Sequence, residues 1–173
     1  MIRKAMIDDL DAIMGILGEI IVEMHGYNNF QWDENYPQVK DFAADIKKGD
    51  LFVCVRDTEI VGFICISGDQ PLEYGELNWS SGEEALVIHR MGVSPNSRNA
   101  GIGAELVGFA EEFSRNSGIR YLKTDTYSLN TKAQGLFQKR GYIFVGEMSF
   151  LGKEKSFYCY EKMLEFKKSG RSV

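Results

Sequence analysis

The apolar residues of this chain change their spacing from one segment to the next, and the spacing predicts where helices and strands lie. Between residues 10 and 24 they recur on one helix face, with Asp8 or Asp9 as the capping residue. That helix ends near residues 25–26. The same pattern predicts further helices over about 38–48, 102–117 and 130–140. Gly49 ends the first of these helices and Gly141 ends the last.

Runs rich in β-branched residues predict seven strands, at residues 2–5, 51–56, 60–67, 86–93, 120–126, 142–149 and 155–163. The turn at residues 57–59 joins the second and third as an antiparallel hairpin. A helix lies between the fourth and fifth strands, and such a crossover requires those two strands to be parallel. We therefore expect an α/β fold with a mixed sheet. Without repeats or linkers, it forms one domain over 1–166 and a frayed tail over 167–173.

Composition narrows the function classes. The chain of 173 residues is 44% hydrophobic and 26% charged, as is ordinary for one globular domain. Its net charge of −5, without a basic block, argues against a nucleic-acid partner and mildly favours a cationic one. The three cysteines show no metal spacing, which indicates buried thiols in a reducing compartment. We find no signal peptide or long apolar span, so we expect a cytoplasmic protein without a membrane partner.

A strand, a glycine-bearing turn and a helix follow one another from Leu86 to Phe113, and this order is typical of an anion site. Arg98 precedes two glycines, Gly101 and Gly103, at the predicted start of the helix. Backbone N–H groups that lack partners converge at a helix N-terminus, where the helix dipole adds positive potential. The turn lacks the Gly-Lys-Ser/Thr of a Walker A loop and the third glycine of a dinucleotide fingerprint.

The pattern Arg-x-x-Gly-x-Gly, after a strand that ends in Val93-Ser94-Pro95, resembles the pyrophosphate loop of the GNAT family, the Gcn5-related N-acetyltransferases. The resemblance implies a mostly antiparallel sheet with a splayed parallel pair, and acetyl-CoA as the cosubstrate without a metal. It implies cofactor contacts from Met91, Gly92, Val93, Arg98, Asn99, Ala100, Gly101, Ile102, Gly103 and Ala104. Backbone groups of Met91 and Val93 would hold the pantetheine arm, and the Val93 N–H would polarise the thioester carbonyl.

A second segment is similar to the family's other cofactor motif, in which Asn130 and Ala133 are followed by Leu136, Phe137 and Gly141-Tyr142. Asn130 would contact coenzyme A, although asparagine is also a good helix N-cap and both roles can hold. The family's usual general acid, a tyrosine, belongs at the position of Phe137. Tyr127, Tyr142, Tyr158 or water are the alternatives for protonating the thiolate, which is also a fair leaving group without help.

The attacking amine must lose a proton, and two residues are candidates for the base. Asp125 lies five residues before Asn130, where some ribosomal-protein acetyltransferases of this family are similar in carrying a glutamate. Alternatively it orders the adjacent turn or binds the substrate cation. His89 is the second candidate. Strand alternation predicts that residues 87, 89, 91 and 93 share one face, although a strand histidine is often structural.

The loop 27–37 holds four aromatic residues and shows neither helical nor strand periodicity. Packing is the more frequent role of such residues, and in the family this region folds over the acceptor. We therefore name Trp32 and Tyr36 of this loop as substrate candidates. Tyr127, outside the loop, is a third candidate.

The sequence predicts direct acetyl transfer in a ternary complex to a primary amine, preferably of a small molecule. The alternatives are an acetyl-CoA-binding regulator, a protein-interaction domain, or an acetyltransferase acting on protein N-termini or lysines. A homodimer is possible.

Overall fold

The structure is a computed structural model that describes residues 1–98 and 100–166. Asn99 of the glycine turn and the tail 167–173 lie outside the described residues. The helices are α1 (Leu10–His25), α2 (Val39–Lys48), α3 (Ile102–Asn116) and α4 (Thr131–Lys139), with short 3-10 turns η1 (Ile7–Asp9), η2 (Leu72–Glu76) and η3 (Pro95–Ser97). The strands are β1 (Ile2–Lys4), β2 (Leu51–Arg56), β3 (Glu59–Ser67), β4 (Ala85–Val93), β5 (Tyr121–Tyr127), β6 (Ile143–Met148) and β7 (Phe157–Met163).

The seven strands form one mixed sheet in the order β1-β2-β3-β4-β5-β7-β6. Every neighbouring pair is antiparallel except β4 and β5, which are parallel and joined through α3. The predicted hairpin of β2 and β3 and the predicted parallel pair are therefore confirmed.

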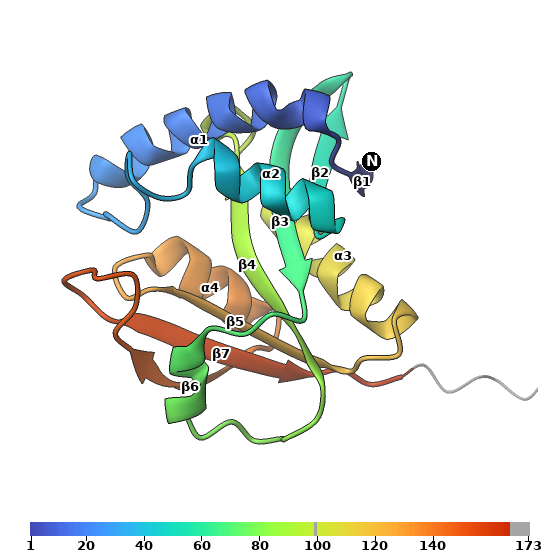
Figure 1. The fold of residues 1–173 in the computed structure, drawn as a ribbon, viewed down its shortest axis with the longest axis vertical. Coiled ribbons are helices and arrows are strands. Elements are labelled where there is room, and N and C mark those ends of the chain that lie inside the picture. The colour runs from blue at the N-terminus through green and yellow to red at the C-terminus, as the bar shows by residue number, and fades with distance from the viewer. Residues whose placement is uncertain (99, 167–173) are drawn as a thin grey trace, which may run out of the picture.

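Helices cover both faces of the sheet (Figure 1). α1 and α2 bury their apolar sides against one face of β2 and β3, where Phe42 meets Phe63 edge to face with ring centroids 5.2 Å apart. α3 and α4 cover the opposite face, where Leu106 and Phe137 belong to the largest buried cluster. Among the described residues, no helix combines the length and apolar character needed to cross a membrane.

The parallel pair separates halfway along its length. β4 and β5 are in register only from Ala85 opposite Tyr121 to Ile88 opposite Thr124, although both strands continue beyond this point. In Figure 1 the two strands diverge, so that α1 lies above the opening and α4 below it. The sheet is thus opened at the carboxyl ends of β4 and β5.

A β-bulge in β4 lies where the strands separate. β3 advances by two residues, from Ile64 to Ile66, while β4 spans three, from Met91 back to Ile88, so β4 holds one extra residue. The bulge reverses the alternation of side chains. Met91 packs under α3, as does Val93, whereas Val87 lies in a cluster on the other face. The prediction that residues 87, 89, 91 and 93 share a face is therefore wrong.

The start of α1 also differs in detail from the prediction. Asp9 occupies the N-cap position, but its side chain accepts a hydrogen bond from the backbone N–H of Met6 at 2.7 Å rather than from α1. It also forms an ion pair with Arg3, and this pair holds the pKa of Asp9 below its usual value. Asp9 therefore ties β1 to the entry of α1.

Candidate active site

A cavity of about 960 Å³ lies between the separated ends of β4 and β5. Its walls come from α1, the loop 27–37, the end of β4, the glycine turn, the start of α3, the end of β5 and α4. It brings together fourteen of the site residues named from the sequence: Trp32, His89, Met91, Gly92, Val93, Arg98, Gly101, Ile102, Gly103, Ala104, Asp125, Asn130, Ala133 and Phe137. Tyr36, Ala100 and Tyr127 are not among its lining residues, and Asn99 lies outside the described part of the chain.

The first turn of α3 presents unpaired backbone donors to this cavity. Gly101 is the N-cap, with φ of 74°, a left-handed conformation that favours glycine, and no side chain of the described residues caps the helix. The first N–H bonded within the helix is that of Glu105, which donates to the Gly101 carbonyl at 3.0 Å. The N–H groups of Ile102, Gly103 and Ala104 therefore have no acceptor within the helix, and they are placed to bind an anion.

Two basic side chains, Arg98 and Lys132, line the cavity at the end that contains the first turn of α3. Arg98 precedes the glycine turn and Lys132 lies in the first turn of α4, and both pair with Glu23 near the end of α1. Arg98 is partly buried, and its Nε atom has no hydrogen-bond partner among the described residues. This end of the cavity is therefore suited to a ligand that carries negative charge.

The exposed edge of β4 offers backbone groups along the cavity. Ser94 N–H donates to the Val61 carbonyl at 2.9 Å, so this position is the hydrogen-bonded one on the β3 side. Because antiparallel positions alternate, the N–H and C=O groups of Val93 and Met91 point away from β3, toward the side that β5 has left. Gly92 allows α1 to pack closely here, since a Cβ would lie 2.7 Å from Ile20 Cδ1.

Asp125 lies on β5 just beyond the point of separation and lines the cavity. Desolvation raises the pKa of its carboxyl group to about 6, although a hydrogen bond from Tyr74 acts in the opposite direction. A carboxylate with such a pKa is a better proton acceptor near neutrality than an ordinary aspartate.

Tyr74 was not indicated by the sequence. It lies in η2, within a segment of mixed polar residues, and its hydroxyl donates to Asp125 Oδ2 at 2.7 Å. Trp79 packs on its ring and donates through Nε1 to its carbonyl oxygen at 2.8 Å, so Tyr74 is held from both ends. The two partners are 51 positions apart, and no local pattern links them.

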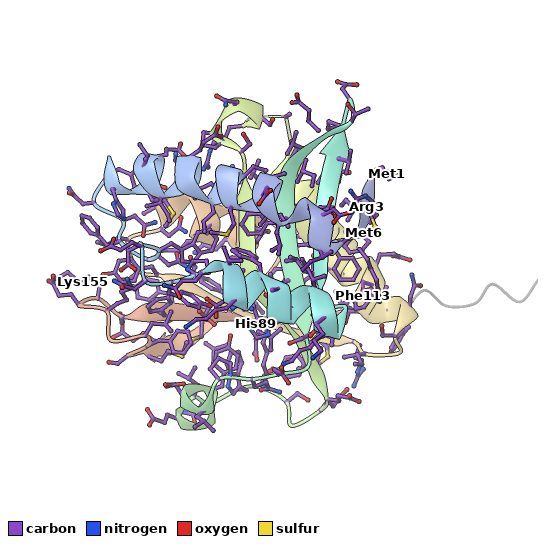
Figure 2. The ribbon with its side chains drawn as sticks, turned by 45° about the horizontal axis from the view of Figure 1, so that its top comes forward. Met1, Arg3, Met6, His89, Phe113 and Lys155 are labelled. Carbon is purple, nitrogen blue, oxygen red and sulfur yellow. The ribbon has the colours of Figure 1, made fainter. Side chains whose placement is uncertain are left out.

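His89 is partly buried and lies beside α2 in the view of Figure 2. Its Nε2 lies 2.9 Å from Ser67 Oγ. Burial, together with the neighbouring Arg90, lowers the pKa of His89 to about 4, so its ring is neutral at physiological pH. A neutral imidazole with so low a pKa holds a proton only weakly.

Residues of the second motif cap α4 and pack in the core. The Asn130 side chain accepts a hydrogen bond from Ala133 N at 3.2 Å and so caps α4, while its Nδ2 donates to Gln31 Oε1 at 3.0 Å. Phe137 is buried and packs edge to face on Tyr142. None of the three tyrosines named as alternative acids (Tyr127, Tyr142 and Tyr158) is among the lining residues of the cavity.

The aromatic loop closes one side of the cavity. Trp32 is only 5% exposed and stacks on Phe63, so it packs in the core while also lining the cavity. Gln31 Oε1 accepts hydrogen bonds from Thr126 Oγ1 at 3.3 Å and from Asn130, so it connects the loop to β5 and α4.

The remaining substrate candidates are engaged elsewhere. The hydroxyl of Tyr36 accepts a hydrogen bond from Arg90 Nη1 at 2.6 Å, and Arg90 is itself paired with Asp45. Tyr127 is buried, and its hydroxyl accepts from Lys155 N at 3.2 Å. Both side chains therefore support the walls of the site without lining the cavity.

None of the three cysteines lines the cavity, although Cys159 of β7 is the cross-strand partner of Asp125. Cys54, Cys65 and Cys159 are all buried and free. Desolvation raises the pKa of Cys65 and of Cys159 to about 12, so neither is a thiolate near neutrality. The described residues contain no cluster of three or more His, Cys, Asp or Glu side chains suited to a metal ion.

Comparison with known proteins agrees with this geometry. The family model of the acetyltransferase (GNAT) family matches residues 19–142. Streptothricin acetyltransferase of Streptomyces lavendulae is 26% identical over 83% of this chain and 82% of its own length. Aminoalkylphosphonate N-acetyltransferase of Salmonella typhimurium LT2 is 24% identical over 82% of this chain and 83% of its own length.

The likeness extends to solved structures. A crystal structure of a candidate acetyltransferase from Staphylococcus aureus Mu50 superposes with a TM-score of 0.76. The match is 32% identical and covers 95% of this chain and 99% of the other. The similarity therefore includes both halves of the opened sheet.

Proposed function

Since this chain belongs to the GNAT family of acetyltransferases, which use acetyl-CoA, we propose that it acetylates a primary amine of a small molecule by direct attack. The observation that carries this proposal is the cavity between β4 and β5, because it joins an anion site at α3 to a carboxylate at Asp125. Membership of the family establishes that the chain is an acetyltransferase. The acceptor and the roles of the residues are our proposal.

The residues present fit acetyl-CoA, whose thioester would supply the activated acetyl group. The N–H groups of Ile102, Gly103 and Ala104, with Arg98, would bind the diphosphate. The free backbone groups of Met91 and Val93 would bind the pantetheine arm as a neighbouring strand would. Asn130 would also contact this arm, and the Val93 N–H would stabilise the negative charge that develops on the carbonyl oxygen.

Asp125 would take the proton from the attacking amine. Its raised pKa of about 6 lets it hold a proton long enough to act as a base at neutral pH, which His89, with a pKa of about 4, does less well. Tyr74 would keep the carboxylate oriented. We therefore assign the role of general base to Asp125 rather than to His89.

The buried, protonated cysteine thiols support direct transfer rather than transfer through a covalent enzyme intermediate. A covalent route would need a thiolate at the cavity, whereas the cysteines are buried and the pKa values of Cys65 and Cys159 lie near 12. The departing coenzyme A thiolate would be protonated by water, since Phe137 has no proton to give and a thiolate is a fair leaving group.

A small acceptor is supported by the way in which the loops close over the site. Lys153, in the turn between β6 and β7, forms an ion pair with Asp33 of the aromatic loop, and its side chain is only 15% exposed. Gln31 joins the same loop to β5 on the other side. A peptide chain would have to break these links, whereas a small amine would not. The relatives named for streptothricin and for aminoalkylphosphonate acetylation agree with this assignment.

The proposal is tested by a screen for thiol release from acetyl-CoA with small amines, polyamines, amino acids and peptides. We expect turnover with a small primary amine, and a loss of about 10²- to 10³-fold in kcat/KM for Asp125→Asn, as is usual for removal of a general base. His89→Ala should retain more activity than Asp125→Asn. Coenzyme A binding without turnover on any amine would instead indicate a regulator, and turnover on peptides alone would contradict the small acceptor.

A further inference from the structure

The carboxylate of Glu23 occupies a position between the two cations of the anion site. Its Oε2 pairs with Arg98 Nη2, and its Oε1 lies 3.0 Å from Lys132 Nζ. All three side chains line the cavity, and they come from three elements: α1, the glycine turn and α4. The pairs therefore cross the cavity at the end where the proposed diphosphate would bind.

We propose that Glu23 is an internal competitor of the diphosphate, which holds Arg98 and Lys132 in the free protein and releases them when acetyl-CoA binds. This inference rests on the proposed function, because it concerns the same cofactor site. It assigns to α1 a role in setting the affinity for the cofactor.

The pairing of charges supports competition rather than a purely structural role. The side chain of Lys132 is 54% exposed, and an ion pair so close to solvent stabilises a fold only slightly. Glu23 Oε2, which faces Arg98, is buried and makes no hydrogen bond among the described residues, so the two charges do not satisfy each other. Arg98 Nε is buried without a hydrogen-bond partner among the described residues, so the guanidinium retains a donor that Glu23 does not use. A diphosphate has enough acceptor oxygens to engage it, together with the donors of α3.

Competition of this kind also favours a ligand with two phosphates. A single anion that displaced Glu23 would recover little more than the contacts that Glu23 already makes. A diphosphate gains Arg98, Lys132 and the N–H groups of the first α3 turn together. Glu23 would therefore discriminate against inorganic phosphate, which is abundant and small.

The matched control lies one turn earlier on the same helix. Glu19 is exposed and accepts a weak hydrogen bond from Ser94 Oγ at 3.3 Å, and it is not among the lining residues of the cavity. Glu19→Gln and Glu23→Gln make the same change in net charge with the same change in shape. Any difference between them reports on the position of Glu23 rather than on the overall charge.

Isothermal titration calorimetry with coenzyme A at low salt tests the inference. We expect Glu23→Gln to bind about fivefold more tightly than the wild type, the factor expected for one charge acting over a few ångströms near water, and Glu19→Gln to bind like the wild type. In an Arg98→Gln background the gain from Glu23→Gln should shrink, because the competitor has lost its main partner.

The outcomes separate the two proposals. A wild type that binds coenzyme A with an affinity that Glu23→Gln leaves unchanged or weakens would overturn the competition and leave the proposed function standing. An equal gain in Glu19→Gln would also overturn it. A wild type and a Glu23→Gln variant that both fail to bind coenzyme A would overturn the proposed function, and the competition with it.

Discussion

The carboxyl group of Asp125 is subject to two opposed influences. Burial at the cavity raises its pKa and the hydrogen bond from Tyr74 lowers it, with burial the larger effect. A group with such a pKa can exchange a proton at neutral pH, whereas an exposed aspartate is a much weaker base. The same burial makes its ionised form a cost to the fold, so the proposed catalytic role and stability are opposed at this residue.

Asp125→Asn should stabilise the protein at high pH. The folded-state pKa of about 6 lies above the unfolded value near 3.8, so the folded state binds the proton more tightly. The stability that this group contributes is present at low pH and is lost as pH rises through 6. Asparagine stays neutral, so we expect the variant to gain about 2 to 3 kcal/mol over the wild type at pH 8 and much less at pH 4.5. Urea unfolding at the two pH values measures this.

The exposed substitution Asp8→Asn is the control, since it removes a carboxylate from the same chain at a solvated position. A gain for Asp125→Asn that does not grow between pH 4.5 and 8 would mean that its carboxyl group is not desolvated in the fold.

Tyr74→Phe should shift the pH dependence of catalysis. The lost hydroxyl is the donor that lowers the pKa of Asp125, so the acid limb of kcat/KM should move upward by about one pH unit. Profiles measured from pH 5 to 9 provide the comparison. Tyr121→Phe removes another buried hydroxyl from the same sheet, one bonded to Glu161, and its limb should stay in place. If both variants shift the limb equally, Tyr74 has no specific influence on Asp125.

At the scale of elements, the site depends on three local breaks in regular structure. The bulge in β4 reverses its side chains, the register with β5 ends at Ile88, and the glycine turn leaves the start of α3 without a side-chain cap. The second and third breaks leave backbone groups without partners among the described residues, and these are the groups that we propose to bind the cofactor.

Gly101→Ala should weaken coenzyme A binding more than its effect on stability would suggest. Both Gly101 and Gly118 have left-handed backbone angles, φ of 74° and 75°, with open space where a Cβ would lie. Alanine at either position should cost about 1 kcal/mol in the free energy of unfolding. Only Gly101→Ala should reduce the affinity, because its strain falls on the donors of α3. Denaturant unfolding and calorimetry on both variants test this, and an equal loss of affinity in Gly118→Ala would contradict it.

The sequence predicts most of these elements because their patterns are local. The apolar stripe of α1, the hairpin at residues 57–59 and the capping role of Asn130 all depend on residues within a few positions of one another. The bulge does not, because the extra residue in β4 is defined only by its pairing with β3. The prediction for the face of His89, Met91 and Val93 failed for that reason.

The candidate site also has one part that the local sequence indicates and one part that depends on distant contacts. The anion-binding half is continuous in sequence from Met91 to Ala104, and the glycine spacing indicates it. The half that we propose to be catalytic brings Tyr74 to Asp125 and Gln31 to Asn130, which are 51 and 99 positions apart. Such contacts follow from the order of the strands, and no short motif encodes them.

At the scale of the whole molecule, the separation of β4 and β5 divides the sheet into two halves, and side-chain contacts connect these halves across the cavity. In Figure 1, α1 and the loop that follows it lie above α4 and β5–β7, and residues from both groups line the cavity. Glu23, Gln31 and Asp33 each connect the first half to the second. We propose that these links restrict which ligands can enter without rearrangement.

Lys153→Ala should broaden the range of acceptors. It removes the ion pair that joins the β6–β7 turn to Asp33, so peptide acceptors should gain roughly tenfold in kcat/KM relative to a small amine. The control is Lys155→Ala in the same turn. Lys155 projects at the rim of the molecule (Figure 2) and pairs only with the exposed Glu154 among the described residues. An unchanged acceptor ratio in Lys153→Ala would show that this link does not restrict the acceptor.

The most direct measurement is a crystal structure of the protein grown with excess acetyl-CoA. We expect the diphosphate at the N–H groups of Ile102, Gly103 and Ala104, and the pantetheine arm between β4 and β5. We also expect the thioester carbonyl near the N–H of Val93, and Glu23 turned away from Arg98. Acetyl-CoA bound elsewhere on the molecule, or a cavity left without it at saturating concentration, would contradict the proposed function.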